Sequence, residues 1–312
     1  MRIVITEFMD DDAVATLVKA FGEGNVMYDA ALVDKPDALA ALLPNARALI
    51  VRNRTQVRGM LLAQATRLEV VGRLGVGLDN IDLAACEARG IKVFPATGAN
   101  DVSVAEYVIT AALVLLRRAW FATDRVAQGQ WPRNDLMGGE VSGKTLGLIG
   151  FGAIARETAR RARALGMAAI AHDPFVAIDD PAWARLGAKP VDFAALLASA
   201  DVVSLHVPLT DGTHNLINAP ALATMKPGAV LINAARGGVV DETALVAALK
   251  AGVIGGAALD VFAQEPLKGD AAAVFAGCPN LILTPHIAGV TEESNVRVSW
   301  VTVENVKKAL AV

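Results

Sequence analysis

Residues Gly147 to Ala155 run Gly-Leu-Ile-Gly-Phe-Gly-Ala-Ile-Ala, and this stretch decides the fold of the 312-residue chain. An apolar strand candidate at 145–149 leads into the glycines, and a helical pattern follows them. Gly150 would allow a tight turn, and Gly152 would let the backbone approach a pyrophosphate at the N-terminus of the helix. Ala155 stands at the third position, which the fingerprint accepts. The stretch therefore predicts a βαβ unit that binds a dinucleotide through Gly150, Gly152 and the helix start at Ala153 and Ile154.

An acidic residue at the end of the next expected strand supports this interpretation. Asp173 lies about 20 residues beyond the second glycine, where a carboxylate accepts hydrogen bonds from the ribose hydroxyls and repels a 2′-phosphate. NAD is therefore the expected cofactor. The alternative is an ordinary glycine-containing turn followed by a surface aspartate.

Short β-branched runs alternate with Ala- and Leu-rich helical segments along the whole chain, which indicates parallel sheets covered by helices on both faces. The rhythm changes near residue 99, and a final helix at about 292–310 could return to the first set of strands. We expect an α/β protein of two doubly wound, Rossmann/flavodoxin-like parallel-sheet domains with a cleft between them. Residues 1–98 with 289–312 would form the substrate domain, and residues 99–288 the NAD-binding Rossmann domain.

Composition narrows the class of protein further. Hydrophobic residues make up 54% and charged residues 20% of the chain, so it is apolar enough to fold, and disorder is excluded. The net charge of −3 without a Lys/Arg-rich block argues against nucleic acid or an anionic membrane as partner. Cys86 and Cys278 lie far apart, which favours a reducing, cytoplasmic setting. Neither a signal peptide, a membrane span nor a regulatory extension after Val312 is expected.

Three polar residues follow later strands, where ligands bind in open α/β sheets. Arg236 comes just after an expected strand, and a guanidinium there can hold a carboxylate bidentately. Glu265 and His286 each follow another strand, and together they supply a carboxylate that orients an imidazole and stabilises its protonated form. The alternative for Arg236 is a salt bridge on the surface. No Cys/His cluster has the spacing of a metal site, so no metal is expected.

In this order, the glycine motif, Asp173, the run 233–242, the run 259–266 and Pro285-His286 resemble the D-isomer-specific 2-hydroxyacid dehydrogenases. The likeness extends into the first half through residues 71–82 and is strongest to the D-3-phosphoglycerate dehydrogenase branch. The resemblance implies that Arg236, Glu265 and His286 are catalytic, and that backbone amides at Val76 and Gly77 hold the substrate carboxylate. It also implies a homodimer built on the helix at 101–118. The implied cofactor contacts are Gly150, Gly152, Ala153, Ile154, Asp173, Val207, Ala234, Arg236, Asp260, His286 and Gly289.

The activity implied is reversible hydride transfer between a nicotinamide and C2 of a D-type 2-hydroxy or 2-oxo acid. Arg54, after an expected strand of the first domain, adds a guanidinium suited to a second anionic group on the substrate. 3-Sulfolactate and 3-phosphoglycerate are the candidates, and the runs 52–55 and 73–77 most resemble the (S)-sulfolactate dehydrogenase subgroup. The alternative is that Arg54 faces solvent or pairs with a surface acid.

Two other functions remain open from the sequence. The first is a glyoxylate/hydroxypyruvate reductase, which needs no second anionic group on its substrate. The second is a dinucleotide-sensing corepressor, which binds the cofactor without turnover. The intact trio of Arg236, Glu265 and His286, and the lack of a charged or low-complexity tail, argue against the corepressor.

Overall fold

The computed structural model describes residues 2–118 and 122–311, so Met1 and Val312, the outer limits of the expected substrate domain, lie outside it. The chain divides into two compact units. Unit 1 comprises Met1–Asn100 and Val290–Val312, and unit 2 comprises Asp101–Gly289. The chain therefore leaves unit 1 once and returns to it for its last helix.

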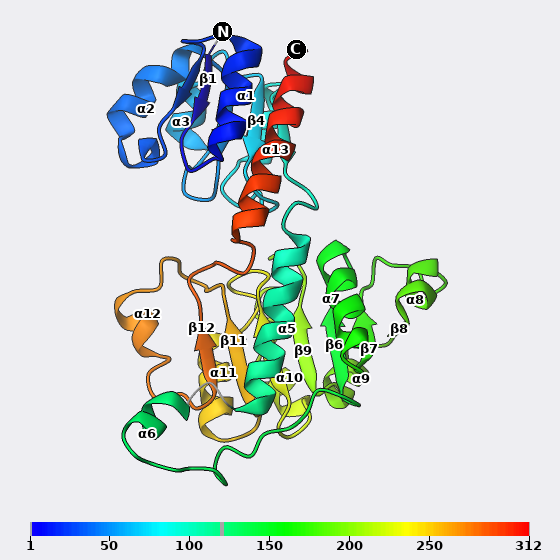
Figure 1. Ribbon diagram of the computed structural model, residues 1–312. Helices are drawn as coiled ribbons and strands as arrows, with labels where there is room; N and C mark the ends of the chain where they lie inside the picture. Colours follow the sequence, from blue (N-terminus) through cyan, green and yellow to red (C-terminus); the bar gives the residue numbers. More distant parts are fainter. Residues whose placement is uncertain (1, 119–121, 312) are drawn as a thin grey trace. The chain divides into compact units, whose positions relative to one another are not determined.

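Unit 1 holds a five-stranded parallel sheet in the order β2-β1-β3-β4-β5. Its strands are β1 (Arg2–Ile5), β2 (Val26–Tyr28), β3 (Ala46–Val51), β4 (Val70–Arg73) and β5 (Lys92–Pro95). Its helices are α1 (Asp11–Phe21), α2 (Pro36–Leu42), α3 (Gly59–Gln64), α4 (Leu83–Ala88) and α13 (Glu292–Ala309), with 3₁₀ turns at Leu32–Asp34 and Leu43–Asn45. Figure 1 shows α13, from the end of the chain, beside α1 from its beginning.

Both faces of this sheet are buried, as continuous apolar strands require. Alternate residues of β1 and β3 face either α1 and α13 or α2, α3 and α4. Gly72 in β4 lets α13 lie close, because a Cβ there would stand 2.8 Å from Thr302 Cγ2 and 3.0 Å from Val306 Cγ2. A capping box at Thr291 and Ser294 starts α13.

Unit 2 holds a seven-stranded parallel sheet in the order β12-β11-β10-β9-β6-β7-β8. Its strands are β6 (Thr145–Ile149), β7 (Ala168–His172), β8 (Ala188–Pro190), β9 (Val202–Leu205), β10 (Val230–Asn233), β11 (Gly256–Leu259) and β12 (Leu281–Leu283). Its helices are α5 (Asp101–Arg117), α6 (Thr123–Ala127), α7 (Ala153–Ala164), α8 (Pro181–Leu186), α9 (Phe193–Ser199), α10 (Ala219–Thr224), α11 (Glu242–Lys250) and α12 (Gly269–Ala273). Helices α5 and α7 cover one face, and α9, α10 and α11 cover the other (Figure 1).

The order of the strands reverses between β6 and β9, because β7 and β8 extend from one side of β6 and β9 to β12 from the other. Such a switch point is where ligands bind in open α/β sheets. The fold class expected from the sequence is confirmed for each unit, with parallel strands and helices on both faces.

Two strands were not expected from the sequence, Val26–Tyr28 and Ala188–Pro190. Each has three residues and lies at the edge of its sheet. Edge strands can be short, partly exposed and interrupted by proline, as β8 is, and neither of these two is a run of Val, Ile and Leu. Among the described residues, no helix is long and apolar enough to cross a membrane.

Candidate active site

The chemistry-bearing residues of unit 2 come together at the carboxyl edge of its sheet. Each follows a different strand, and parallel strands all end at the same edge. In sheet order they are Gly289 and His286 after β12, Asp260 after β11, Ala234 and Arg236 after β10, Val207 after β9, Gly150 after β6 and Asp173 after β7.

The glycine motif has the backbone geometry that a bound pyrophosphate requires. Gly150 has φ +92°, and a Cβ at this position would lie 2.4 Å from the carbonyl oxygen of His206. Gly152 caps α7, and a Cβ there would meet no atom within 4 Å. The first turn of α7 holds no acidic side chain, and its N-cap forms no side-chain hydrogen bond. The amides at this helix start are therefore open to an anion, and the motif fits the diphosphate of NAD.

Asp173 joins the end of β7 to the glycine motif. Its Oδ2 accepts the N–H of Phe151 at 2.8 Å, and its Oδ1 accepts the N–H of Phe175 at 2.9 Å. The carboxylate is half-buried and follows β7 directly. It thus lies next to Gly150 and Gly152, as a group that contacts the ribose of a dinucleotide must.

Glu265 and His286 form a direct pair. His286 Nδ1 lies 2.8 Å from Glu265 Oε2, and the second carboxylate oxygen accepts the N–H of Phe262 at 3.0 Å. Burial alone would raise the pKa of Glu265. The hydrogen bond and charge of His286, the Phe262 N–H and the charge of Arg236 outweigh burial and hold the pKa of Glu265 below its ordinary value. Glu265 therefore stays ionised, and Nε2 is the ring nitrogen of His286 left for proton transfer.

Arg236 is held by the turn that follows β10. The buried Asn233 side chain donates to the carbonyl oxygen of Arg236 at 2.9 Å and accepts the N–H of Ala235 at 3.1 Å. Gly237 runs against the next loop so closely that a Cβ would lie 1.7 Å from the carbonyl oxygen of Phe262. This close approach sets the Arg236 turn beside the loop that carries Glu265.

Asp260 holds the loop that carries His286, a role the sequence did not suggest. Its Oδ1 accepts the Thr284 hydroxyl at 2.6 Å and the Ile287 N–H at 2.8 Å, and its Oδ2 accepts the Ala288 N–H at 2.8 Å. The Asp260 carbonyl oxygen accepts the N–H of His286 at 2.8 Å. Burial raises the pKa of Asp260, although these hydrogen bonds and the charge of His286 oppose the rise.

The loop residue His286 itself has φ +58°, a conformation uncommon for residues other than glycine. Thr284 extends the network outward, because its hydroxyl also lies 2.6 Å from the hydroxyl of Tyr107 on α5. Burial raises the pKa of Tyr107 to about 12, so this phenol stays protonated and can donate to Thr284.

The candidate residues of unit 1 also follow strand ends. Val76 and Gly77 lie in the turn after β4 and are half-buried. Within the described part of the chain, neither of their backbone N–H groups donates a hydrogen bond. Two adjacent free amides are suited to a carboxylate.

Arg54 pairs with a surface acid, the alternative that the sequence left open. Its Nη1 donates to Asp34 Oδ2 at 3.0 Å, and its Nη2 donates to Asp34 Oδ1. The hydrogen bond from Arg54 holds the pKa of Asp34 below its ordinary value. Both side chains are more than half exposed, so the pair is open to exchange with a ligand.

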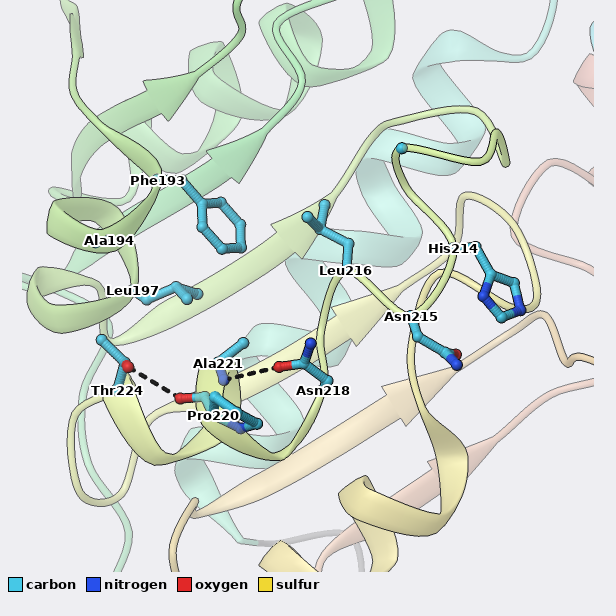
Figure 2. A pocket seen from close by; sticks show the side chains of 11 residues that line it. Phe193, Ala194, Leu197, His214, Asn215, Leu216, Asn218, Pro220, Ala221 and Thr224 are labelled. Atoms are coloured by element: carbon cyan, nitrogen blue, oxygen red, sulfur yellow. Dashed lines mark hydrogen bonds between the residues drawn. The ribbon is translucent and has the colours of Figure 1, made fainter.

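A hollow of about 480 Å³ also lies in unit 2, between α9, α10 and the loop before α10 (Figure 2). Phe193, Leu197 and Leu216 contribute apolar side chains to it, and His214 also lines it. None of the candidate catalytic or cofactor residues lines it. Among the described residues, no group of three or more His, Cys, Asp or Glu is placed to hold a metal ion.

Comparison with known proteins assigns the class. Residues 109–288 match the family model of the D-isomer specific 2-hydroxyacid dehydrogenase NAD binding domain. The chain is 56% identical over 310 residues to an (S)-sulfolactate dehydrogenase of Chromohalobacter salexigens, covering 99% of this chain and 98% of that one. It is 39% identical over 306 residues to a D-3-phosphoglycerate dehydrogenase of Archaeoglobus fulgidus, covering 98% of this chain and 56% of that longer one.

Among solved structures, the chain is similar to a D-lactate dehydrogenase of Aquifex aeolicus complexed with NAD and lactic acid. The TM-score is 0.87 at 30% identity, with 99% of this chain and 96% of that one covered. The protein therefore belongs to the D-isomer-specific 2-hydroxyacid dehydrogenase family. It is an oxidoreductase that uses NAD and acts on the CH–OH group of a 2-hydroxy acid.

Proposed function

We propose that this enzyme interconverts a D-type 2-hydroxy acid and its 2-oxo acid, and that the substrate carries a second anionic group, with 3-sulfolactate first and 3-phosphoglycerate second. The observation that supports this reaction is the pairing of His286 with Glu265, whose Nδ1 and Oε2 atoms lie 2.8 Å apart. The pair lies at the carboxyl edge of the unit 2 sheet, the edge at which the glycine motif also lies. The similarity to an (S)-sulfolactate dehydrogenase over nearly both whole chains, together with Arg52 and Arg54, supports the substrate.

His286 and Glu265 carry the proton. Bound NADH supplies the hydride that reaches C2 of the oxo acid. His286 Nε2 gives its proton to the carbonyl oxygen during reduction and takes it back from the hydroxyl during oxidation. Glu265 on Nδ1 fixes the orientation of the ring and stabilises the imidazolium that forms when Nε2 takes up the proton.

Arg236 orients the substrate. Its half-buried guanidinium stands near Glu265, whose pKa its charge lowers. There it holds the carboxylate and polarises the carbonyl of the 2-oxo acid, which places C2 for hydride transfer. In unit 1, the amides of Val76 and Gly77 take the carboxylate, and Arg54 takes the second anionic group. Unit 1 is accordingly the substrate domain, and unit 2 is the NAD-binding domain.

The proposed cofactor contacts lie along the carboxyl edge of the unit 2 sheet. Gly150, Gly152, Ala153 and Ile154 hold the diphosphate, and Asp173 accepts the ribose hydroxyls. The further contacts are Val207, Ala234, Arg236, Asp260, His286 and Gly289. Because Asp173 would repel a 2′-phosphate, we expect kcat/KM to be about 100-fold higher with NADH than with NADPH. Equal values would remove Asp173 from this role.

A reductase screen tests the substrate. Sulfopyruvate, phosphohydroxypyruvate, hydroxypyruvate, glyoxylate and phenylpyruvate are compared at saturating NADH. The proposal expects the highest kcat/KM for sulfopyruvate or phosphohydroxypyruvate. A preference for glyoxylate or hydroxypyruvate would instead make the protein a glyoxylate/hydroxypyruvate reductase.

We also propose that the enzyme is a cytoplasmic homodimer. The family resemblance supports the dimer and assigns its interface to α5. The free thiols of Cys86 and Cys278, which lie in different units, support a reducing compartment. Light scattering coupled to gel filtration checks the dimer, and a mass near 32.4 kDa would contradict it.

A further inference from the structure

One buried carboxylate of unit 1 has no part in the site so far. Glu7 follows β1 after a single residue, and only 4% of its surface is exposed. Strand β1 is hydrogen-bonded to β3, and β3 leads into Arg52 and Arg54. Glu7 therefore lies at the same carboxyl edge of the sheet as these two arginines.

The carboxylate of Glu7 binds the backbone of the arginine loop, residues 52–55. Its Oε1 accepts the N–H of Arg52 at 2.9 Å and the N–H of Thr55 at 3.0 Å, and its Oε2 accepts the N–H of Arg54 at 3.1 Å. Three peptide N–H groups in four residues thus converge on one charge. Such a concave set of amides binds anions, and here the anion is part of the chain.

The carbonyl side of the arginine loop is fixed as well. Asn80 Nδ2 donates to the carbonyl oxygens of Arg52 at 3.1 Å and Thr55 at 2.7 Å, and the hydroxyls of Thr55 and Thr6 lie 2.7 Å apart. Asn80 and Thr55 are buried. Of the four residues of the loop, only Asn53 makes no hydrogen bond within the described part of the chain. Hydrogen bonds thus fix the backbone of Arg52, Arg54 and Thr55.

Phe8, the residue after Glu7, contacts the side chain of Arg52. The Arg52 guanidinium carbon lies 5.8 Å from the centre of the Phe8 ring, and Arg52 also donates to Asn295 on α13. Burial lowers the pKa of Arg52, and the charge of Glu7 opposes that effect. Glu7 thus fixes the loop backbone and favours the charged form of its first arginine.

We propose that Glu7 is a positioning residue, which holds the arginine loop so that Arg52, Asn53 and Arg54 face the second anionic group of the substrate. This inference rests on the proposed function, because it assigns a substrate group to the loop. Glu7 does not touch the reacting atoms. Its loss should therefore weaken binding of substrates that carry the second anion and leave the chemical step intact.

The test compares Glu7→Gln and Glu7→Asp with wild type. Glu7→Gln keeps the shape but presents an NH₂ group to a backbone N–H, and Glu7→Asp keeps the charge with a shorter reach. Glu69→Gln is the matched control, because Glu69 is a carboxylate of the same unit that pairs with Arg47 and is not in contact with the arginine loop. KM and kcat are measured with NADH for sulfopyruvate, phosphohydroxypyruvate and glyoxylate, which lacks the second anion.

For Glu7→Gln we expect KM for the two larger substrates to rise about tenfold, with kcat within about threefold of wild type and glyoxylate kinetics nearly unchanged. Glu7→Asp should give a smaller rise, and Glu69→Gln none. Hydrogen exchange should quicken at residues 52–55 in Glu7→Gln, while exchange in β4 stays as it is. Equal changes for all substrates, or unchanged kinetics and exchange, would overturn the proposal.

A folding defect of Glu7→Gln and a failure of the proposed function can each be distinguished from a failure of this inference. If Glu7→Gln shows no cooperative melting transition, the ratio of KM values in Glu7→Asp decides, and an unchanged ratio overturns the positioning role. Wild-type protein that reduces none of the three acids would overturn the proposed function and this inference with it. Wild-type activity on the two larger acids with an unaltered ratio in both variants would overturn this inference alone.

Discussion

Two loops of this protein, residues 284–288 of unit 2 and the arginine loop of unit 1, are each held by one buried carboxylate at a sheet edge. Asp260 accepts two backbone N–H groups and one hydroxyl from the first loop. Glu7 accepts three backbone N–H groups from the second. In both cases the carboxylate follows a neighbouring strand and satisfies donors that would otherwise be left unpaired.

The loops differ in what their functional side chain contacts. His286 is paired with Glu265, which belongs to the proposed catalytic machinery, so its orientation is set before a substrate binds. Arg54 is paired with Asp34, an exposed acid outside that machinery. A substrate must therefore displace Asp34 before it can bind the Arg54 guanidinium. The first loop should therefore govern kcat and the second KM, and the predictions below test this division.

The largest effect is expected for His286→Ala. Loss of the general acid should lower kcat about 1,000-fold, because proton transfer by a positioned side chain contributes roughly 10²–10⁴-fold. The dissociation constant for NADH, measured by fluorescence titration, should stay within about threefold of wild type. His214→Ala, which changes a histidine lining the hollow of Figure 2, is the control and should retain full activity. A comparable kcat in both variants would remove His286 from proton transfer.

Asp260→Asn should act through the first loop. The amide NH₂ would face a backbone N–H of Ile287 or Ala288, which leaves a buried donor unpaired and costs about 1–3 kcal/mol of stability. A misplaced His286 should then lower kcat about 30-fold while KM changes little. Thermal unfolding and steady-state kinetics give both numbers. A rise in KM without loss of kcat would contradict the proposal that the loop at 284–288 governs kcat and the arginine loop governs KM.

Much of the fold could be predicted from the sequence because most of its strands are short apolar runs. The strand at 145–149 has the bounds expected for it. The edge strands β2 and β8 could not be recognised, because neither is a run of Val, Ile and Leu, whereas the edge strand β12 is Leu-Ile-Leu.

The candidate site could be predicted in part for the same reason. Arg236, Glu265 and His286 each follow a strand, so their meeting at one edge follows from a parallel sheet. The rule applies equally to Glu7, which follows an apolar strand, but nothing in the sequence says that its carboxylate turns inward to bind peptide groups. The pairing of Arg54 with Asp34 depends on where an exposed helical turn lies, which no local pattern specifies.

Glu265→Gln should shift the pH dependence of reduction. Burial would raise the pKa of Glu265, but the hydrogen bond and charge of His286, the Phe262 N–H and the charge of Arg236 together lower it, so Glu265 carries its charge throughout the assay range. That charge favours the protonated imidazole, the form that reduction needs. Without it, the fall in kcat on the alkaline side should begin at a lower pH. At pH 7, kcat should fall about tenfold. An unmoved profile would make Glu265 a structural residue.

Arg54→Ala tests the second loop directly. Loss of one exposed guanidinium should raise KM for sulfopyruvate and phosphohydroxypyruvate about fivefold, with kcat nearly unchanged. Glyoxylate kinetics should be unaffected, since that acid has no second anionic group. Arg58→Ala, which removes a nearby exposed arginine of the same unit, controls for general loss of positive charge. Identical KM values for all three acids in Arg54→Ala and wild type would contradict the proposal that Arg54 binds a second anionic group of the substrate.

Asp34→Asn should have the smallest effect and the opposite sign. Asp34 holds both terminal nitrogens of Arg54, and its pKa is lowered by that hydrogen bond, so it stays charged near neutral pH and competes with the substrate for Arg54. Exposed pairs of this kind are weak, so release of Arg54 should lower KM for sulfopyruvate only about twofold. Because the competition is electrostatic, the gain should shrink as salt is raised. A higher KM in Asp34→Asn would mean that Asp34 orients Arg54 toward the substrate and does not compete with it. The arginine loop would then be preassembled in the same way as the loop of His286.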